Sequence, residues 1–330
     1  MKLATYSPKG AQSHQSSIGA VVGDEIIDLH YAYARYLREV EGEMRAYQLA
    51  DGRVPGDMIG FLQGGEKAID AAKQTIDFVK NLRKDHVKGI SGEKLIYALA
   101  DVKILAPISR PGKILAAGKN YADHVKEGAA ATGGSSELRP FPGGFVKVSS
   151  VIIGPDDPVE IAHVTQRLAY ESELAVVIGK RGRYIPKEKA YEYIAGYTII
   201  NDVSARDIQF AESKYGNHLL GKNMDTLCPM GPWIVLKDEV PDPMNLNIQL
   251  KVNGKLRQDS NTSHLIFGIP ALLERWSWVT LEPGDIIATG TPAGTPVGEK
   301  DPYLLPGDVM ECIIERLGTL RNPVVAENLA

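Results

Sequence analysis

Short apolar runs rich in β-branched residues, separated by turn-forming residues, dominate the chain after residue 107. Runs of this length with glycine- and proline-containing turns between them are typical of strands. The clearest run, residues 174–179, follows directly on two carboxylates, Glu171 and Glu173. We expect strands at residues 113–117, 145–147, 171–178, 197–201, 233–236, 247–252, 285–289 and 309–314, with helices near 187–194 and 263–277.

The region before residue 108 has a different pattern. Three short apolar stretches, at residues 3–6, 20–22 and 26–29, precede helical spacing over 32–45 and 66–83. A junction rich in proline and glycine at 106–113 ends this region. We therefore predict an α+β protein with a small N-terminal accessory domain, 1–107, and a strand-rich domain, 108–330. Residues 128–140 are rich in Gly, Ala and Ser, and we predict a mobile loop there.

Composition narrows the class of protein. The 330 residues are 44% hydrophobic and 24% charged, which is ordinary for a globular protein, and the net charge of −4 gives no basic footprint for nucleic acid or an anionic membrane. The N-terminus has no apolar signal core, and no stretch approaches about 18 apolar residues. Cys228 and Cys312 are far apart in sequence. We expect a cytoplasmic protein with reduced thiols and no nucleic-acid or membrane partner.

The carboxylates at the start of the 171–178 run carry the first chemical signal. Side chains two apart in a strand point to the same face, so Glu171 and Glu173 should lie about 6.5–7 Å apart. Two like charges at the edge of a core call for a cation between them, and Mg²⁺ with several waters fits. Asp202, at the end of the run 197–201, could be a third ligand. The alternatives are a solvent-facing strand end with two unrelated glutamates, and for Asp202 a helix N-cap before Val203.

A histidine and a glutamate three residues apart form the second signal. His124 and Glu127 share one face of a helical turn, and a carboxylate beside an imidazole fixes its tautomer and makes it a better general base. The alternative is an exposed turn with an incidental contact. The glycine-rich segment that follows favours a lid over an active site.

Two further segments offer groups for an anion. Residues 216–222 match the G-x-x-x-x-G-K pattern of a P-loop, but Asn223 replaces the magnesium-binding Ser or Thr, which excludes that assignment. Lys222 could still reach into a cleft and stabilise an oxyanion. The loop 289–294 has hydroxyls and backbone N–H groups that could bind a carboxylate, or it is a plain turn.

Taken together, these segments resemble the fumarylacetoacetate hydrolase family, in order and over roughly residues 108–325. The matching segments are GKNYADH (118–124), YExELAVVIGK (170–180), GYT with NDVSARDIQ (196–198 and 201–209), GK with DT (221–222 and 225–226), CPMGPW (228–233) and PGDIIxTGTP (283–292).

The resemblance implies a mixed β-roll catalytic domain, a homodimer, and one Mg²⁺ or Mn²⁺ per subunit. It implies metal ligation by three carboxylates and a catalytic role for a lid pair and a lysine, and it places further residues near the substrate. The implied ligands are Glu171, Glu173 and Asp202; the implied catalytic residues are His124, Glu127 and Lys222; the implied substrate-binding residues are Tyr121, Arg206, Gln209, Gly290 and Thr291. The chain departs from the family at Ala169, where many members have Asp, and in its longer loop 293–298.

The function predicted from these residues is metal-dependent hydrolysis of a C–C bond in acylpyruvate-type substrates, which are 2,4-diketo acids. The keto acid would chelate the cation, which acts as Lewis acid. His124, held by Glu127, would activate a water that attacks the distal carbonyl, and Lys222 with the cation would stabilise the departing enolate. The alternatives are an isomerase or decarboxylase of unsaturated keto or hydroxy diacids, and a non-catalytic keto-acid binder.

Overall fold

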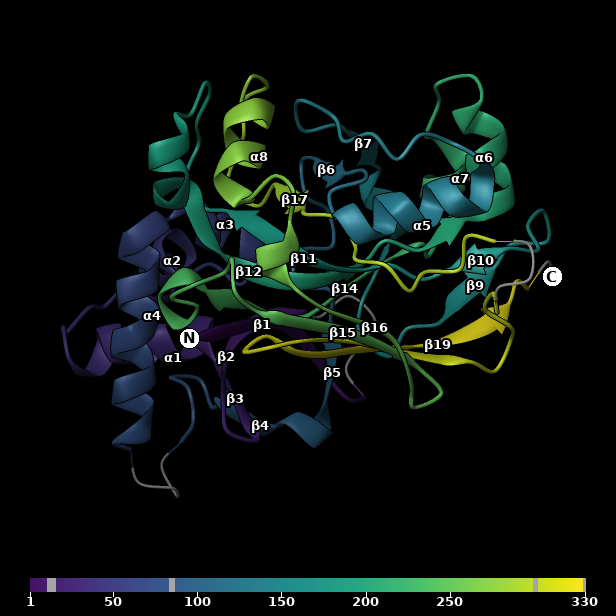
Figure 1. Ribbon diagram of the computed structural model, residues 1–330. Helices are drawn as coiled ribbons and strands as arrows, with labels where there is room; N and C mark the ends of the chain where they lie inside the picture. Colours follow the sequence, from purple (N-terminus) through teal and green to yellow (C-terminus); the bar gives the residue numbers. More distant parts are fainter. Residues whose placement is uncertain (11–15, 83–86, 299–301, 329–330) are drawn as a thin grey trace.

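A computed structural model describes residues 1–10, 16–82, 87–298 and 302–328, and within them two large β-sheets pack face to face (Figure 1). The twelve-stranded sheet has the order β4 (Ile96–Ala98), β3 (Glu25–Asp28), β2 (Ser17–Val22), β1 (Lys2–Pro8), β14 (Cys228–Leu236), β12 (Ile194–Asn201), β11 (Ser172–Ile178), β17 (Ile286–Ala288), β6 (Ile114–Ala117), β7 (Gly144–Lys147); β5 (Val102–Leu105) pairs with β1, and β8 (Ile152–Ile153) with β14.

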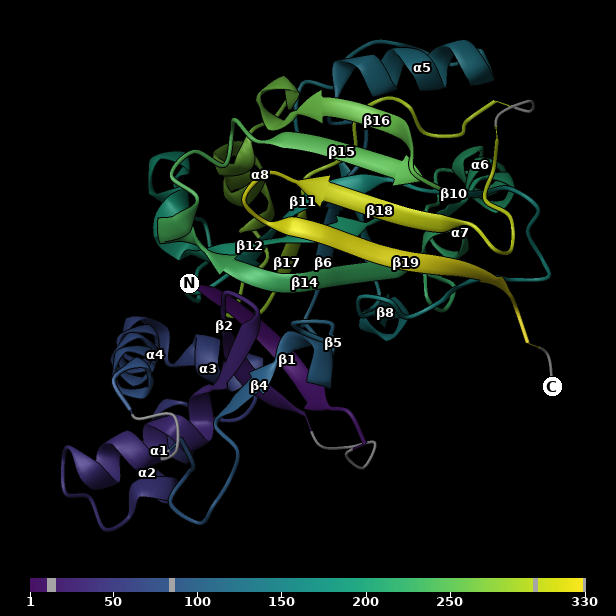
Figure 2. The ribbon, with the colours of Figure 1, turned by 90° about the horizontal axis from the view of Figure 1, so that it is seen from below.

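The second sheet covers one face of the first. Its order is β16 (Lys255–Asn261), β15 (Asn247–Val252), β18 (Val309–Ile314), β19 (Gly318–Ala326), β9 (Val159–Ile161), and Figure 2 shows its four longer strands side by side. A separate short pair joins β10 (Leu168–Ala169) and β13 (Ser204–Ala205). The α-helices are α1 (Leu29–Glu39), α2 (Ala46–Arg53), α3 (Met58–Gln63), α4 (Gly65–Lys80), α5 (Ala122–Thr132), α6 (Arg206–Ser213), α7 (Leu220–Asn223) and α8 (Ile269–Trp276).

Strand β11 is buried on both faces, which explains its unbroken apolar sequence. Leu174, Val176 and Ile178 belong to the core between the two sheets, whereas Ala175 and Val177 belong to the core on the opposite face. Side chains alternate along a strand, so each face receives every second residue. All eight strands expected after residue 107 are confirmed as β6, β7, β11, β12, β14, β15, β17 and β18. The prediction of a mixed α+β fold is likewise confirmed.

The N-terminal strands extend the same large sheet. Strand β1 pairs antiparallel with β14, with Leu3 opposite Ile234, and both side chains join one apolar core. Figure 2 shows β1–β5 and α1–α4 gathered on one side of the molecule. Because a sheet and a core continue across residue 107, the division into domains 1–107 and 108–330 stays a prediction.

Several predicted helix boundaries are wrong, each for a local reason. The helix expected over 32–45 ends at Glu39, and Gly42 with its positive φ separates it from α2. The helix expected over 263–277 begins only at Ile269, after Gly268, with Pro270 in its first turn. Residues Lys187–Tyr193 form a 3₁₀-helix. The helix expected over 66–83 is α4, and Arg83 lies outside the described residues.

The segment 128–140, predicted to be a loop, is helical in its first part. Helix α5 continues to Thr132 because three consecutive alanines, 129–131, are strong helix formers. Gly133 ends the helix in the left-handed conformation that favours glycine. Among the described residues, no helix combines the length and the apolar character needed to cross a bilayer.

Candidate active site

A cavity of about 510 Å³ is lined by residues of α5, α6 and the start of β11. Its lining brings together residues that are far apart in sequence, among them His124, Glu171, Glu173, Lys222 and Thr291. All five are residues that the sequence singled out. The structure therefore gathers the predicted chemistry at one place, while the roles of these residues remain to be argued from geometry.

Three buried carboxylates meet at the inner end of this cavity. The antiparallel register sets Ser172 of β11 opposite Asn201 of β12, so Glu171 and Asp202 flank the same end of the strand pair. The Glu171 N–H donates to the Asn201 side chain at 2.8 Å, and the Asp202 N–H donates to the Glu171 carbonyl at 2.8 Å. One carboxylate oxygen each from Glu171, Glu173 and Asp202 lies within 4.8 Å of the others. Asp202 is not a helix N-cap, since α6 begins only at Arg206.

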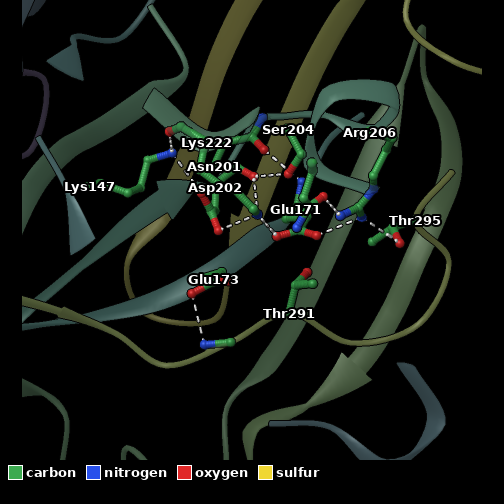
Figure 3. A network of polar contacts seen from close by, with 12 residues as sticks. Lys147, Glu171, Glu173, Asn201, Asp202, Ser204, Arg206, Lys222, Thr291 and Thr295 are labelled. Carbon is green, nitrogen blue, oxygen red and sulfur yellow. Dashed lines mark hydrogen bonds and ion pairs between the residues drawn. The ribbon is translucent and has the colours of Figure 1, made fainter. Parts of the chain in front are cut away.

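Three buried cations surround the carboxylates (Figure 3). Lys222 Nζ lies 2.6 Å from Glu171 Oε2 and 2.6 Å from Asp202 Oδ2. An Arg206 guanidinium nitrogen lies 2.6 Å from Glu171 Oε1, and Lys147 Nζ lies 2.7 Å from Asp202 Oδ1. These ion pairs hold two of the carboxylates in place. Lys222 belongs to the short helix α7 and contacts the carboxylates, which agrees with the exclusion of a P-loop at residues 216–222.

Glu173 has no such partner among the described residues. Its Oε2 accepts the Gly290 N–H at 2.8 Å, but no described cation forms an ion pair with it. Burial, and then the negative charges of Asp202 and Glu171, raise the pKa of Glu173 well above its usual range. Glu173 thus lacks the positive charge that would stabilise its ionised form beside two other carboxylates.

Glu171 and Lys222 stabilise each other's charged forms. Burial alone would raise the pKa of Glu171, but Arg206 and Lys222 outweigh it and hold that pKa far below the usual range. Burial would lower the pKa of Lys222, but Asp202 and Glu171 outweigh it and raise that pKa. Lys222 is therefore a fixed positive charge rather than a proton acceptor.

The donor set fits a hard divalent cation. Buried carboxylate oxygens close to one another are ligands that Mg²⁺ and Mn²⁺ prefer, and the uncompensated Glu173 is the group that a cation would satisfy. Glu171, Glu173 and Asp202 could therefore hold such an ion.

The histidine and glutamate of α5 form a pair at the cavity wall. His124 Nδ1 lies 3.1 Å from Glu127 Oε2, and both side chains are half-buried rather than fully exposed. Glu127 Oε1 also accepts the Gly294 N–H at 2.9 Å. The glutamate thus connects α5 to the loop after β17 and orients the imidazole. His124 lines the cavity.

The remaining predicted residues occupy different positions. Gln209 lines the cavity and accepts a hydrogen bond from Arg206 at 2.9 Å. Thr291 also lines it, and its hydroxyl donates to the Ser172 carbonyl at 2.9 Å. Gly290 acts through its N–H on Glu173. Tyr121 is fully buried at the start of α5, outside the cavity lining, and its hydroxyl has no hydrogen-bond partner within the described residues.

Sequence reasoning missed Lys147, the most deeply buried cation of the site. It ends the short strand β7, and its Nζ donates to the Lys222 carbonyl at 2.5 Å besides pairing with Asp202. One lysine at the end of a four-residue strand carries no distinctive spacing. Only the pairing of β7 with β6, at the edge of the large sheet, places it beside a carboxylate 55 positions away.

We expect Lys147→Met to destabilise the metal-free protein by about 3 kcal/mol, because it leaves the buried Asp202 charge with one cation fewer. Saturating Mg²⁺ would supply positive charge at the same place and recover part of this loss. Thermal unfolding in a chelator and in Mg²⁺ tests the prediction. An equal loss of stability under both conditions would show that Lys147 acts through packing alone.

Comparison with known proteins agrees with the site. The chain belongs to the fumarylacetoacetate (FAA) hydrolase C-terminal family, whose model matches residues 113–325, and the resemblance seen in the sequence is thereby confirmed. The mitochondrial oxaloacetate tautomerase fahd2 of Xenopus laevis is 38% identical over 329 residues, covering 98% of this chain and 90% of that protein. Oxaloacetate tautomerase YisK of Bacillus subtilis is 38% identical over 329 residues, 98% of this chain and 100% of that protein.

Solved structures share the architecture. The maleylpyruvate hydrolase of Sphingobium sp. SYK-6, in complex with manganese(II) and pyruvate, has a TM-score of 0.70 and 29% identity, covering 99% of this chain and 100% of that one. The family therefore includes both isomerising and hydrolytic enzymes, and this chain is a member of an enzyme family.

Proposed function

We propose that this protein is a divalent-metal-dependent tautomerase that interconverts the enol and keto forms of oxaloacetate or a closely related 2-oxo diacid. The proposal assigns Mg²⁺ or Mn²⁺ to Glu171, Glu173 and Asp202. It is supported by two relatives of nearly full length that are named oxaloacetate tautomerases, and by the manganese and pyruvate in the hydrolase structure. The geometry of the cavity gives an independent reason.

The balance of buried charge is the observation that carries the proposal. When Glu173 is ionised, the charges of the three carboxylates equal those of three cations, Lys147, Arg206 and Lys222, although these cations pair with Glu171 and Asp202 and not with Glu173. A divalent cation at the carboxylates would supply Lewis acidity toward the oxygens of a 2-oxo acid and leave two positive charges unmatched. A buried surplus of this kind favours an anionic substrate. The same positive charge favours the enolate of the substrate, in which negative charge lies on the oxygen at carbon 2.

The protein's own residues then have to move one proton. His124 is the titratable side chain of α5 that lines the cavity, so we assign it the addition and removal of the proton at carbon 3, while the hydroxyl proton of the enol is exchanged with water. Glu127 holds the imidazole by its Nδ1, which directs Nε2 toward the substrate. Lys222 keeps its charge and holds Glu171 and Asp202, while Arg206 fixes the other oxygen of Glu171.

Hydrolysis of a C–C bond in acylpyruvates, the function predicted from the sequence, is the second candidate. The observation in its favour is the His124–Glu127 pair, because a supported imidazole at a cavity wall can activate water as readily as it can accept a proton from carbon. Both reactions begin with a 2-oxo acid at the same carboxylates. In hydrolysis, water attacks the carbonyl carbon 4, the bond between carbons 3 and 4 breaks, and carbon 3 departs in the enolate of pyruvate, which then takes up a proton. In tautomerisation no C–C bond breaks.

The two candidates are separated by their products. We expect protein with Mn²⁺ to accelerate the decay of enol oxaloacetate, followed by ultraviolet absorbance, and to release pyruvate from acetylpyruvate far more slowly. Because the two tautomers have the same mass, absorbance measures the tautomerisation, and mass spectrometry of pyruvate and acetate measures the cleavage of acetylpyruvate. Fast cleavage of acetylpyruvate without acceleration of tautomerisation would replace the first candidate by the second, and inactivity on both would reject the two together.

A further inference from the structure

The outer part of the cavity wall is positively charged. Lys119 follows β6, Arg139 follows α5, Lys214 follows α6 and His218 precedes α7, and all four line the cavity. Three segments of the chain, around residues 119, 139 and 214–218, therefore bring basic side chains to one surface. Burial, and then the charges of Lys222, Arg139 and Lys119, lower the pKa of His218 against the opposing charge of Glu212, so these three cations act on the imidazole.

No acidic side chain offsets this charge within the described part of the cavity lining. The carboxylates that line the described cavity, Glu171 and Glu173, lie at its inner end. Glu212 lies nearby, but its oxygens accept the N–H groups of residues 219–221. Among the described residues, Lys119, Arg139 and Lys214 form no ion pair. The lining of the outer wall thus carries cations and no carboxylate, while the negatively charged Glu212 lies beside it, outside the lining.

The position of Lys119 adds a local argument. Its φ of 58° lies in the left-handed region, where a side chain is disfavoured and glycine is not. The backbone is fixed there because the next residue, Asn120, donates to the Thr289 carbonyl at 2.8 Å and accepts the Phe267 N–H at 2.9 Å. Lysine is thus an unfavourable choice for the fold at this point, and what it supplies is an ammonium group at the cavity.

We propose that Lys119, Arg139 and Lys214 form a second anion subsite that binds the distal carboxylate of a 2-oxo or 2-hydroxy diacid. The inner end of the cavity takes the 2-oxo carboxylate group, so the two subsites select diacids over monoacids of equal length. The inference rests on the proposed function for the orientation of the substrate. It goes beyond that function because it assigns the preference for diacids to three named side chains.

Binding to the manganese-loaded protein tests the subsite without turnover. Two matched pairs differ only in a terminal carboxylate against a methyl group: malate with 2-hydroxybutyrate, and 2-oxoglutarate with 2-oxopentanoate. We expect the wild-type protein to prefer the diacid in at least one pair by about 10-fold, as for one or two charge-assisted contacts. Lys119→Gln/Arg139→Gln should remove most of that preference. Oxalate, which has no distal group, should bind both proteins equally.

Lys126→Gln is the matched control, since Lys126 is an exposed lysine of α5 outside the cavity lining. It should leave the preference unchanged. Lys119→Gly should weaken diacid binding while raising the melting temperature, because glycine relieves the left-handed backbone. No preference in either wild-type pair, or an undiminished preference in the double variant, would overturn the subsite. Absence of tautomerase activity with a preserved diacid preference would reject the proposed function alone.

Discussion

Glu173→Gln is expected to abolish metal-dependent activity and, at the same time, to stabilise the metal-free protein. The activity falls because one of three ligands loses its charge, and the contribution of a Lewis-acid metal is several kcal/mol, or about 10³-fold or more in rate. The stability rises because Glu173 is a buried carboxylate without an ion pair among the described residues, next to two other carboxylates. Glutamine keeps the shape and can still accept the Gly290 N–H.

The pH dependence of the free energy of unfolding shows whether the Glu173 carboxylate destabilises the metal-free protein. The pKa of Glu173 is higher in the folded protein than in the unfolded chain, so the folded state binds the proton more tightly. The metal-free wild-type protein should therefore lose stability as the pH rises above the ordinary range for glutamate. Glu173→Gln should remove that part of the slope.

Thermal unfolding with and without Mg²⁺ measures both effects. The wild-type protein should gain stability on metal addition, and the variant should start from a higher melting temperature and show no gain. Glu188→Gln, at an exposed position of the 3₁₀-helix, is the control and should behave as wild type. A variant that still gains stability from Mg²⁺ would show that Glu173 is not a ligand.

His124→Ala should lower the rate of oxaloacetate tautomerisation by about 10²–10⁴-fold, the usual contribution of a general acid–base group. His124 is not among the three carboxylates, so the metal-induced gain in stability should be preserved. Glu127→Gln should cost less, because the imidazole stays in place and only its orientation and protonated form are less well supported. Initial rates at saturating Mn²⁺ measure both variants.

The same variant distinguishes the two candidate reactions. If acetylpyruvate cleavage is lost in His124→Ala while tautomerisation survives, the imidazole activates water, and the hydrolase hypothesis gains its main support. If both reactions keep their wild-type rates, another group transfers the proton. A loss of metal binding in His124→Ala would instead indicate that α5 supports the structure of the site.

The carboxylate cluster could be predicted from sequence because its determinants are local. Glu171 and Glu173 adjoin a β-branched run that can only be a buried strand, and Asp202 ends a second one. The antiparallel pairing of these two successive strands then brings Asp202 beside the glutamates. The His124–Glu127 pair is also local, since three residues of helix fix its geometry.

The cations of the site could not be predicted in the same way. Lys222 was identified as a candidate, but its contacts with Glu171 and Asp202 depend on the approach of α7 to the end of β12. Lys147 was missed because its position depends on the edge of a sheet assembled from strands across the whole chain. Long-range pairing, rather than local propensity, decides which charges become buried together.

The end of α5 was mispredicted because glycine and alanine have opposite helix propensities. The segment 128–140 was interpreted as a loop from its overall composition, but its alanines extend the helix to Thr132 before Gly133 ends it. This difference bears on the proposed anion subsite. Arg139 lines the cavity, and the segment that contains it begins at the end of helix α5 rather than within a loop that starts at Gly128.

The most direct test of the account is the decay of enol oxaloacetate with protein and Mn²⁺ added separately and together. Metal-stripped protein alone and Mn²⁺ alone should each leave the decay near the rate in buffer. Protein with Mn²⁺ should accelerate it, chelator should abolish the acceleration, and Glu173→Gln should not support it. A decay with protein and Mn²⁺ that equals the decay with Mn²⁺ alone would contradict the assignment of a metal-dependent tautomerase to this cavity.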